Sequence, residues 1–260
     1  IKTVLGTAAI GKMISDSVNA GGALQQSLGG IETLFKDSAD KVKTYAAQAY
    51  KTAGLSANDS MESTTSFAAS LLSSVSRDTD AAAQLANMAM VDMSDNANKM
   101  GSSMQDIQNA YQGFAKQNYT MLDNLKLGYG GTKQEMERLL ADAEKISGVK
   151  YDISSYADVV EAIHVMQESM DIAGTTAKEA EATISGSVNA LKSAVSNLIV
   201  GFGDADADME LLCNNMVDAF KTVVANITPV IENIVAALPT ALDALLTAVG
   251  ELLPTLPVSY

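Results

Sequence analysis

Few side chains in this sequence could carry out acid–base or nucleophilic chemistry, because the chain contains one histidine and one cysteine. His164 lies in the stretch VVEAIHVMQESM, with Glu161 three residues before it and Glu168 four residues after it. In a helix this spacing places both carboxylates near the imidazole, and no nucleophile lies nearby in the sequence. We therefore predict a structural histidine paired with a carboxylate rather than a general base.

Cys213 has no second cysteine with which to form an intramolecular disulfide or a cysteine-based metal site. We expect it to be a small buried hydrophobic side chain. The thirteen methionines are spread along the chain at core spacing, which indicates adaptable packing rather than metal binding.

Two short stretches resemble ligand-binding loops but lack residues that those loops need. DADAD at residues 204–208 matches the start of a calcium loop, but Met209 and Asn215 stand where Gly and a bidentate Glu are required. We expect these acidic side chains to cap the helix that follows. GYGGTK at residues 128–133 lacks the spacing of a phosphate loop and follows no predicted strand. The sequence thus predicts no catalytic residue, metal site or cofactor, and we do not expect an enzyme.

The composition also narrows the class of protein. The chain has 260 residues, of which 47% are hydrophobic, and this is enough for one or two domains with a core. Its formal net charge is −14 and no cluster of Lys and Arg is present, so nucleic acid is not an expected partner. The chain opens IKTVLGTAAIGKMISDSV, already at helical spacing and without a signal-peptide pattern. We interpret it as a fragment of a longer protein.

Helix boundaries follow a recurring signal, in which Gly closes one helix and Ser, Thr or Asp opens the next. TKQE at residues 132–135 and TAKE at residues 176–179 have the pattern of capping boxes, and Ser56 with Asp59 is similar. These signals predict helices over residues 2–26, 38–53, 57–75, 79–99, 103–118, 133–147, 156–172, 177–202, 207–237 and 240–252.

No strand pattern competes with these helices. The only strand-like segment, VKYDIS at residues 149–154, is too short and isolated to build a sheet. We therefore predict an all-α fold, in which a multi-helix bundle or stacked short helices are followed by long amphipathic, proline-kinked helices. Residues 1–203 are expected to form the unit of short capped helices, and residues 204–260 the amphipathic heptad-like segment.

The second segment carries a stripe of apolar residues in alternating steps of four and three, which is a heptad pattern. The stripe comprises Met216, Phe220, Val223, Ile227, Val230 and Ile234, and it is widened by Val217, Val224 and Ile231. Because a wide apolar face needs a partner, we predict that the first six residues mediate self-association between parallel copies. Pro229 should kink this helix and Pro239 should end it.

A membrane-active helical protein, whose C-terminal apolar segment inserts into a bilayer, is the alternative. Between residues 222 and 253 the only charges are Glu232, Asp243 and Glu251. Spanning a bilayer takes about 20 consecutive apolar residues, and here a carboxylate or a proline always intervenes. The polar face is acidic, whereas helices at a membrane surface usually carry Lys and Arg. Partner helices are therefore favoured over lipid.

Residues 110–131, AYQGFAKQNYTMLDNLKLGYGG, concentrate aromatic side chains in a chain without Trp. The stretch could be a loop that grips a ligand or a packed connection between helices, and we favour the packed connection. Tyr111, Phe114 and Tyr119 are expected to anchor it in neighbouring helices. Its glycines, Gly128, Gly130 and Gly131, would permit the turn into the next helix.

A longer block, MSDNANKMGSSMQDIQNAYQGFAKQNYTMLDNLKLGYGGTKQEMERLL at residues 93–140, resembles the signature of tail tape measure proteins in long-tailed phages and prophages. The resemblance continues through AIHVMQE at residues 162–168 and GTTAKEAEATISGSVNALKSAVSNLIVGFGD at residues 174–204. The first 36 and the last 20 residues resemble the family only in the general character of their sequence and contain none of these motifs. Tape measure proteins are usually several times longer than this chain.

The resemblance implies a structural protein, a multi-copy α-helical cord that sets tail length during assembly and is released when DNA is delivered. Residues 204–260 would begin that cord. The implied partners are other copies of the chain, the tail tube protein, tail assembly chaperones, tail tip proteins and, during DNA delivery, the host membrane. The implied location is the lumen of the phage tail in the virion, and the bacterial host cytoplasm before assembly. No catalytic residues are implied.

Overall fold

The computed structural model describes the backbone of residues 2–252, and the side chains of residues 17, 19–239, 243, 244 and 247. The backbone in this range is helical with short connections and contains no strand, so the predicted all-α class is confirmed. The elements are α1 (Lys2–Phe35), the 3₁₀ helix η1 (Lys36–Ser38), α2 (Ala39–Thr52), α3 (Ala57–Ser74), α4 (Thr79–Met100), α5 (Met104–Phe114), the 3₁₀ helix η2 (Leu122–Leu125), α6 (Lys133–Ser147), α7 (Tyr156–Ser169), α8 (Thr175–Ala182), α9 (Ile184–Gly201) and α10 (Met209–Leu252).

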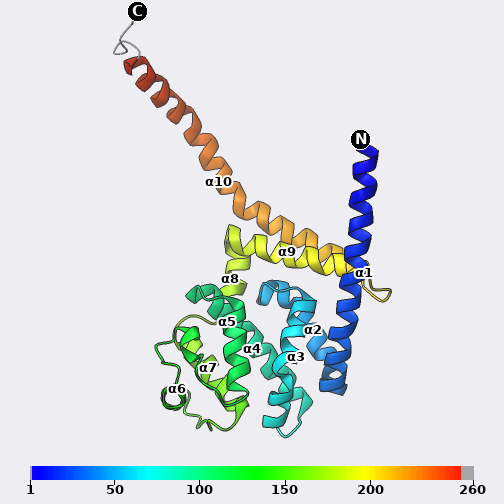
Figure 1. Ribbon diagram of the computed structural model, residues 1–260. Coiled ribbons are helices and arrows are strands. Elements are labelled where there is room, and N and C mark those ends of the chain that lie inside the picture. The colour runs from blue at the N-terminus through cyan, green and yellow to red at the C-terminus, as the bar shows by residue number, and fades with distance from the viewer. Residues whose placement is uncertain (1, 253–260) are drawn as a thin grey trace, which may run out of the picture.

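The main core lies around α4, which packs against α2, α3, α5, α7 and α8 (Figure 1). One face of α4 is lined with small residues such as Ala82, Ala86 and Ala89, which are fully buried and let neighbouring helices approach closely. Met90 and Met93 fill the remaining space on the same helix. The core therefore extends from the C-terminal half of α1 through α7 as one continuous cluster.

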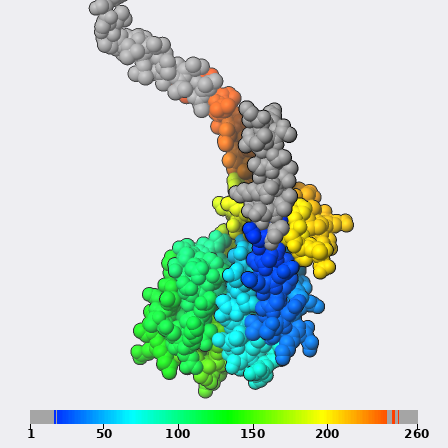
Figure 2. Space-filling view, turned by 45° about the vertical axis from the view of Figure 1, so that its right-hand side comes forward, coloured from blue at the N-terminus to red at the C-terminus, as the bar shows by residue number. Residues whose placement is uncertain are grey.

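Helix α9 lies across one end of this helical core, and α10 packs along α9 before it extends away from the rest of the molecule (Figure 1). The first part of α1 projects from the same end as α10 (Figure 1). The space-filling view shows the orange part of α10 leaving the compact part of the molecule (Figure 2). The connection between α9 and α10 contains the predicted division at residue 203. The molecule thus has a compact head and a long projecting helix.

Local capping accounts for several helix starts, as the sequence predicts. The hydroxyl of Ser56 accepts a hydrogen bond from the Asp59 amide, and the hydroxyl of Thr132 accepts one from the Glu135 amide. The second hydrogen bond of the capping box predicted at Thr132 differs from the expected one. The Glu135 carboxylate accepts from the amide of Gly130 and not from that of Thr132. The bonds from the Asp59 and Glu135 amides each satisfy one of the amides that a helix leaves free at its first turn.

The predicted helix over residues 177–202 is wrong, because the structure divides it at Thr183. This residue has an extended backbone, and its hydroxyl accepts a hydrogen bond from the Gly186 amide, which caps α9. Thr176 is also not the cap of α8, since this helix begins at Thr175 after Gly174 in the left-handed region. The carboxylate of Asp95, on α4, caps α8 instead.

Helix α1 continues to Phe35, beyond the predicted end at residue 26. Ile31 and Phe35 are fully buried in the main core, and this packing outweighs the low helix propensity of Gly29 and Gly30. Tertiary contacts therefore extend the helix past the point at which propensity alone would end it.

The prediction that Pro239 ends a helix is also wrong. Helix α10 is a single helix of 44 residues that includes both Pro229 and Pro239. It bends where it leaves α9 (Figure 1). Both prolines are exposed, so water can hydrogen-bond to the carbonyls that lose an amide partner and the helix tolerates them.

Candidate functional site

The six residues of the predicted self-association stripe all lie on α10, but the structure places them in two environments. Met216, Val223 and Ile227 are half-buried, and Met216 packs against a cluster that includes Ala194 of α9. Phe220, Val230 and Ile234 are exposed, with 56%, 43% and 58% of their surface accessible. The stripe is therefore partly covered by the chain's own earlier helices.

The contact between α9 and α10 rests on a small cluster, separate from the main core. Tyr50 of α2, Ala194 of α9 and Ala219 of α10 are buried together, and Leu191 and Met216 pack against them. Cavities of about 210 Å³ and 320 Å³ lie along this contact. Helix α10 is thus held on the head by a few apolar side chains whose packing leaves cavities.

Two polar contacts position α10 more specifically. Its first turn is capped by Asp208, whose carboxylate accepts a hydrogen bond from the Leu211 amide at 2.9 Å. This confirms the predicted capping role of the acidic run before α10. Further along, the Asn226 side chain donates to the carbonyls of Glu181 and Thr183, at 3.2 and 3.1 Å. Asn226 therefore satisfies carbonyls left free at the break between α8 and α9.

Glycines allow α1 to cross the connection before α10 at very short range. A Cβ added at Gly21 would lie 2.7 Å from the carbonyl oxygen of Gly203, and one added at Gly203 would lie 2.2 Å from that of Ser17. Only glycine fits both positions, because any side chain would collide with backbone. The crossing fixes the position at which α10 leaves the head.

The outer side of α10 exposes a continuous set of large apolar side chains. It comprises Leu211, Val217, Phe220, Val224, Val230, Ile231, Ile234, Val235 and Leu238. The segment Met209–Pro239 is long and apolar enough to cross a membrane by length and composition, and none of its most apolar window is buried. Water contact with so many large side chains is unfavourable, so this surface is a candidate for binding another apolar surface.

Cys213 also lies on the exposed side of α10, which corrects the expectation that it is buried. The neighbouring Leu212 is half-buried and packs toward α9, so it takes the inward position of this helical turn. A single thiol is therefore accessible near the base of α10.

The aromatic stretch forms a packed connection, as we predicted. Tyr111, Phe114 and Tyr119 are buried, and the ring of Phe114 lies 5.8 Å from that of Tyr111 and 6.1 Å from that of Tyr119. The Tyr119 hydroxyl donates to the carbonyl of Ile153. Gly128 adopts a φ of +85°, which permits the turn toward α6.

Tyr129 completes this packing from the end of the same stretch. Its ring lies under the guanidinium of Arg138, at 4.3 Å, and its hydroxyl donates to Asp142 at 2.9 Å. Burial and the Asp142 carboxylate raise the pKa of Tyr129 to about 12, so the phenol remains protonated as a hydrogen-bond donor. The aromatic side chains are thus held by protein partners.

His164 is paired with a carboxylate, as predicted, but its main partner is one that the sequence did not reveal. Its Nδ1 lies 2.9 Å from Oδ1 of Asp92 on α4, while its Nε2 lies 3.4 Å from Glu168. The bond to Asp92 raises the pKa of His164, against the opposing effect of partial burial. Burial raises the pKa of Asp92, because little water reaches its carboxyl group.

Asp95, one turn further along α4, is fully buried and caps α8. Its carboxylate accepts hydrogen bonds from the amides of Gly174, at 2.5 Å, and Thr176, at 2.7 Å. The adjacent Asn96 donates to the carbonyl of Leu125 in η2 at 3.0 Å. Through these hydrogen bonds the polar residues of α4 connect α7, α8 and η2 to the central helix. In the sequence, the run of polar residues within an otherwise apolar helix was the feature that could have indicated these contacts.

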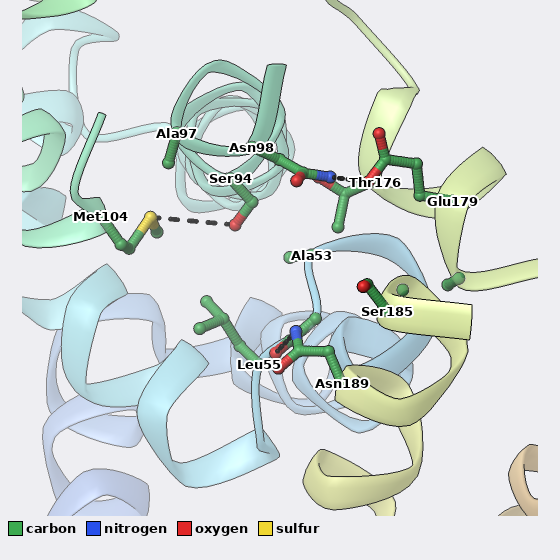
Figure 3. A pocket seen from close by; sticks show the side chains of 13 residues that line it. Ala53, Leu55, Ser94, Ala97, Asn98, Met104, Thr176, Glu179, Ser185 and Asn189 are labelled. Atoms are coloured by element: carbon green, nitrogen blue, oxygen red, sulfur yellow. Dashed lines mark hydrogen bonds between the residues drawn. The ribbon is translucent and has the colours of Figure 1, made fainter. Parts of the chain in front are cut away.

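A cavity of about 490 Å³ lies between α4, α8 and α9 (Figure 3). Two of its polar side chains have partners in the protein: Asn98 donates to Glu179 at 2.7 Å, and Asn189 donates to the carbonyl of Gly54 at 3.1 Å. The hydroxyl of Thr176, which also lines the cavity, is buried without a hydrogen-bond partner. Within the described residues no group of three or more His, Cys, Asp or Glu is placed to hold a metal ion. This cavity offers space without an arrangement of reactive groups.

Comparisons with models of protein families, with curated proteins and with solved structures found no match. The exposed apolar side of α10 is the structural feature that most directly indicates a function.

Proposed function

We propose that this chain is a segment of a phage tail tape measure protein, in which α10 contributes to a helical cord. One structural observation supports the proposal most directly: α10 is a continuous helix of 44 residues that projects from a compact head and exposes its apolar side (Figure 1). At about 1.5 Å per residue such a helix spans about 66 Å. The proposal also draws on the resemblance over residues 93–140.

The mechanism is geometric. A helix advances by a fixed distance per residue, so the number of helical residues determines how far tube subunits can polymerise around it. In this proposal copies of the chain lie in the tail lumen and contact the tail tube protein along their length. Tail assembly chaperones and tail tip proteins bind it during assembly, which begins in the host cytoplasm. The net charge of −14 suits a lumen through which DNA must later pass, because it repels phosphate.

Tail length provides the test. Duplicating residues 217–237, which are three complete heptads, should lengthen the tails by about 32 Å in electron micrographs of virions. A flexible insertion of the same size between Tyr119 and Leu122 provides the control, because it adds residues to the head and should leave tail length unchanged. Tails of parental length after the duplication would contradict the proposal.

The second candidate is a membrane-active protein, which the apolar composition of Met209–Pro239 favours. In that case liposomes should change the helical content of the chain and release an entrapped dye. The tape measure proposal instead expects unchanged circular dichroism and no dye release. The exposed carboxylates of Asp218 and Glu232 support the latter, because charged groups are costly to transfer into lipid.

A further inference from the structure

The cavity between α4, α8 and α9 combines a wall of oxygen atoms with an apolar wall. Figure 3 shows Asn98, Thr176 and Glu179 on one side of this space, and Leu55 and Met104 on the other. The volume of about 490 Å³ is typical of pockets that bind small molecules. We refer to this space as the α8 cavity.

The hydroxyl of Thr176 is a buried polar group of the α8 cavity without a partner in the protein. Only 9% of the residue is exposed, and its backbone amide is already bonded to Asp95 at 2.7 Å. The hydroxyl oxygen forms no hydrogen bond with any residue that the structure describes. Burying a hydroxyl without a partner is unfavourable, so a hydrogen-bond donor bound in the cavity would relieve this cost.

Glu179, one turn further along α8, adds a negative charge to the same wall. Its side chain is half-buried and forms no ion pair with any side chain that the structure describes. Among the described residues that line the cavity, Glu179 is the only charged one. Because a partly buried carboxylate is stabilised by a nearby cation, the α8 cavity favours a cationic ligand.

The oxygen atoms of this wall match a primary ammonium group better than a guanidinium group. A guanidinium pairs best with both oxygens of one carboxylate, but Asn98 already donates to one oxygen of Glu179 at 2.7 Å. An ammonium group instead has three separate donors. The second Glu179 oxygen, the amide oxygen of Asn98 and the Thr176 hydroxyl provide one acceptor for each donor.

The apolar wall suits an unbranched hydrocarbon chain. Leu55, Ala97 and Met104 line it, and each of them is half-buried. The alkyl part of a lysine side chain packs on such a surface while its charged end is held by polar groups. The flexible thioether of Met104 can adjust to chains of different shape.

An anion is the alternative ligand, because Ser185 and Gly186 in the first turn of α9 also line the cavity and helix starts attract anions. The Gly186 amide, however, already donates to the Thr183 hydroxyl at 3.0 Å. The carboxylate of Glu179 would also repel an anion. The charge in the cavity therefore favours the cation.

We propose that the α8 cavity binds a primary alkylammonium group, which is either the lysine side chain of a partner protein or a free linear amine. Glu179, Asn98 and Thr176 hold the nitrogen, and Leu55 and Met104 contact the hydrocarbon chain. The site lies on the head and does not depend on the function proposed for α10.

Simple probes test the charge requirement on the intact 260-residue chain. n-Pentylamine, 1-pentanol and sodium pentanoate have the same unbranched form and differ in charge. Isothermal titration calorimetry measures their affinities, and the amide shift of Thr176 in protein labelled with ¹⁵N-threonine locates the binding. We expect saturable binding of pentylamine, binding of 1-pentanol that is weaker by about tenfold or more, and no binding of pentanoate.

A second pair of probes distinguishes the two sources of the ammonium group. Nα-acetyl-lysine N-methylamide represents a lysine within a polypeptide, and the corresponding arginine compound is its control. Binding of the lysine compound assigns the site to a partner's lysine, whereas binding of pentylamine alone assigns it to a free amine. Both results support the ammonium site. Tighter binding of the arginine compound would contradict it.

Variants test the wall formed by α8. Glu179→Gln removes the charge but keeps an acceptor for Asn98, and it should weaken pentylamine binding by about tenfold or more. Glu181→Gln removes the same charge from an exposed position of α8 outside this cavity and should bind like the parent. Thr176→Val replaces the unpartnered hydroxyl by a methyl group, so it should raise the melting temperature and yet weaken pentylamine binding. A hydroxyl with a purely structural role would not affect binding.

Four results would overturn the inference. They are no saturable binding of pentylamine by the parent, equal affinities for pentylamine and 1-pentanol, tighter binding of pentanoate than of pentylamine, and unchanged affinity in a Glu179→Gln variant that melts like the parent. If Glu179→Gln does not fold, the comparison of the three pentyl probes on the parent decides.

Discussion

Asp92 of α4 and His164 of α7 lie 72 residues apart in the sequence and form a hydrogen bond of 2.9 Å at the interface between the two helices. Only 1% of the Asp92 side chain is exposed, so its negative charge is compensated mainly by the imidazole. Glu168 lies on the other side of the ring and reinforces its protonated form. This pair links the central helix, α4, to α7.

The first prediction concerns the pH dependence of this pair. The pKa of His164 is raised in the folded protein above its ordinary value of 6.5, so its stabilising effect is fully present below that pH. The effect is lost as the pH rises through the folded pKa. We expect the melting temperature to fall as the pH rises from about 6 to about 8.

A His164→Gln variant should lose this pH dependence over the same range. It should also be less stable at pH 6 by about 3 kcal/mol, because it leaves the Asp92 carboxylate buried without a cation. Lys221→Gln, which removes the cation of an exposed pair with Asp218, serves as the control and should keep the parental profile. Identical slopes in the parent and in His164→Gln would contradict the assignment.

A second prediction concerns Asp95 as the cap of α8. Asp95→Ala removes the acceptor for two buried amides, those of Gly174 and Thr176, and should lower the free energy of unfolding by about 2 to 4 kcal/mol. Asp37→Ala, at an exposed position, should change it by less than about 0.5 kcal/mol. Urea unfolding measures both, and hydrogen exchange should show loss of protection at the start of α8 only in the first variant. Equal stabilities of the two variants would exclude the cap.

The third prediction separates packing from ligand binding in the aromatic connection. Phe114 is 1% exposed, so Phe114→Ala should leave a cavity and destabilise the protein by about 3 to 5 kcal/mol. Phe202→Ala removes the same side chain at an exposed position, and its melting temperature should stay close to that of the parent. An unchanged melt in Phe114→Ala, accompanied by the loss of binding to a ligand, would support the binding loop that we did not favour.

The fourth prediction uses two adjacent glycines of α1. In Gly21→Ala the new Cβ meets the carbonyl of Gly203 at 2.7 Å, so α1 must shift from the connection before α10. In Gly22→Ala the new Cβ meets nothing within 4 Å and replaces Gly inside a helix, which should stabilise the protein by about 0.5 to 1 kcal/mol. Thermal melts should therefore shift in opposite directions. Limited proteolysis should cut residues 202–208 faster in Gly21→Ala than in the parent, and a stabilised Gly21→Ala variant would show that the crossing is not tight.

The sequence by itself determined those features that depend on neighbouring residues. Ser56 and Thr132 cap the helices that follow them, because cap and amide lie three residues apart and no other part of the chain is involved. The apolar spacing on α10 and the burial of Phe114 were also predictable, since periodicity and side-chain size show which faces avoid water. These local signals were sufficient for the all-α class and for most helix boundaries.

The tertiary structure alone decided which residues meet over long distances. The bonds from Asp92 to His164 and from Asp95 to Gly174 span 72 and 79 residues, and a carboxylate in a helix does not indicate by its local pattern which distant group it will contact. The same holds for α10, where the packing of α9 covers Met216 and leaves Val217 exposed. Neighbouring apolar residues on one helix are equivalent in the sequence, and only the position of the adjacent helix makes one of them core and the other surface.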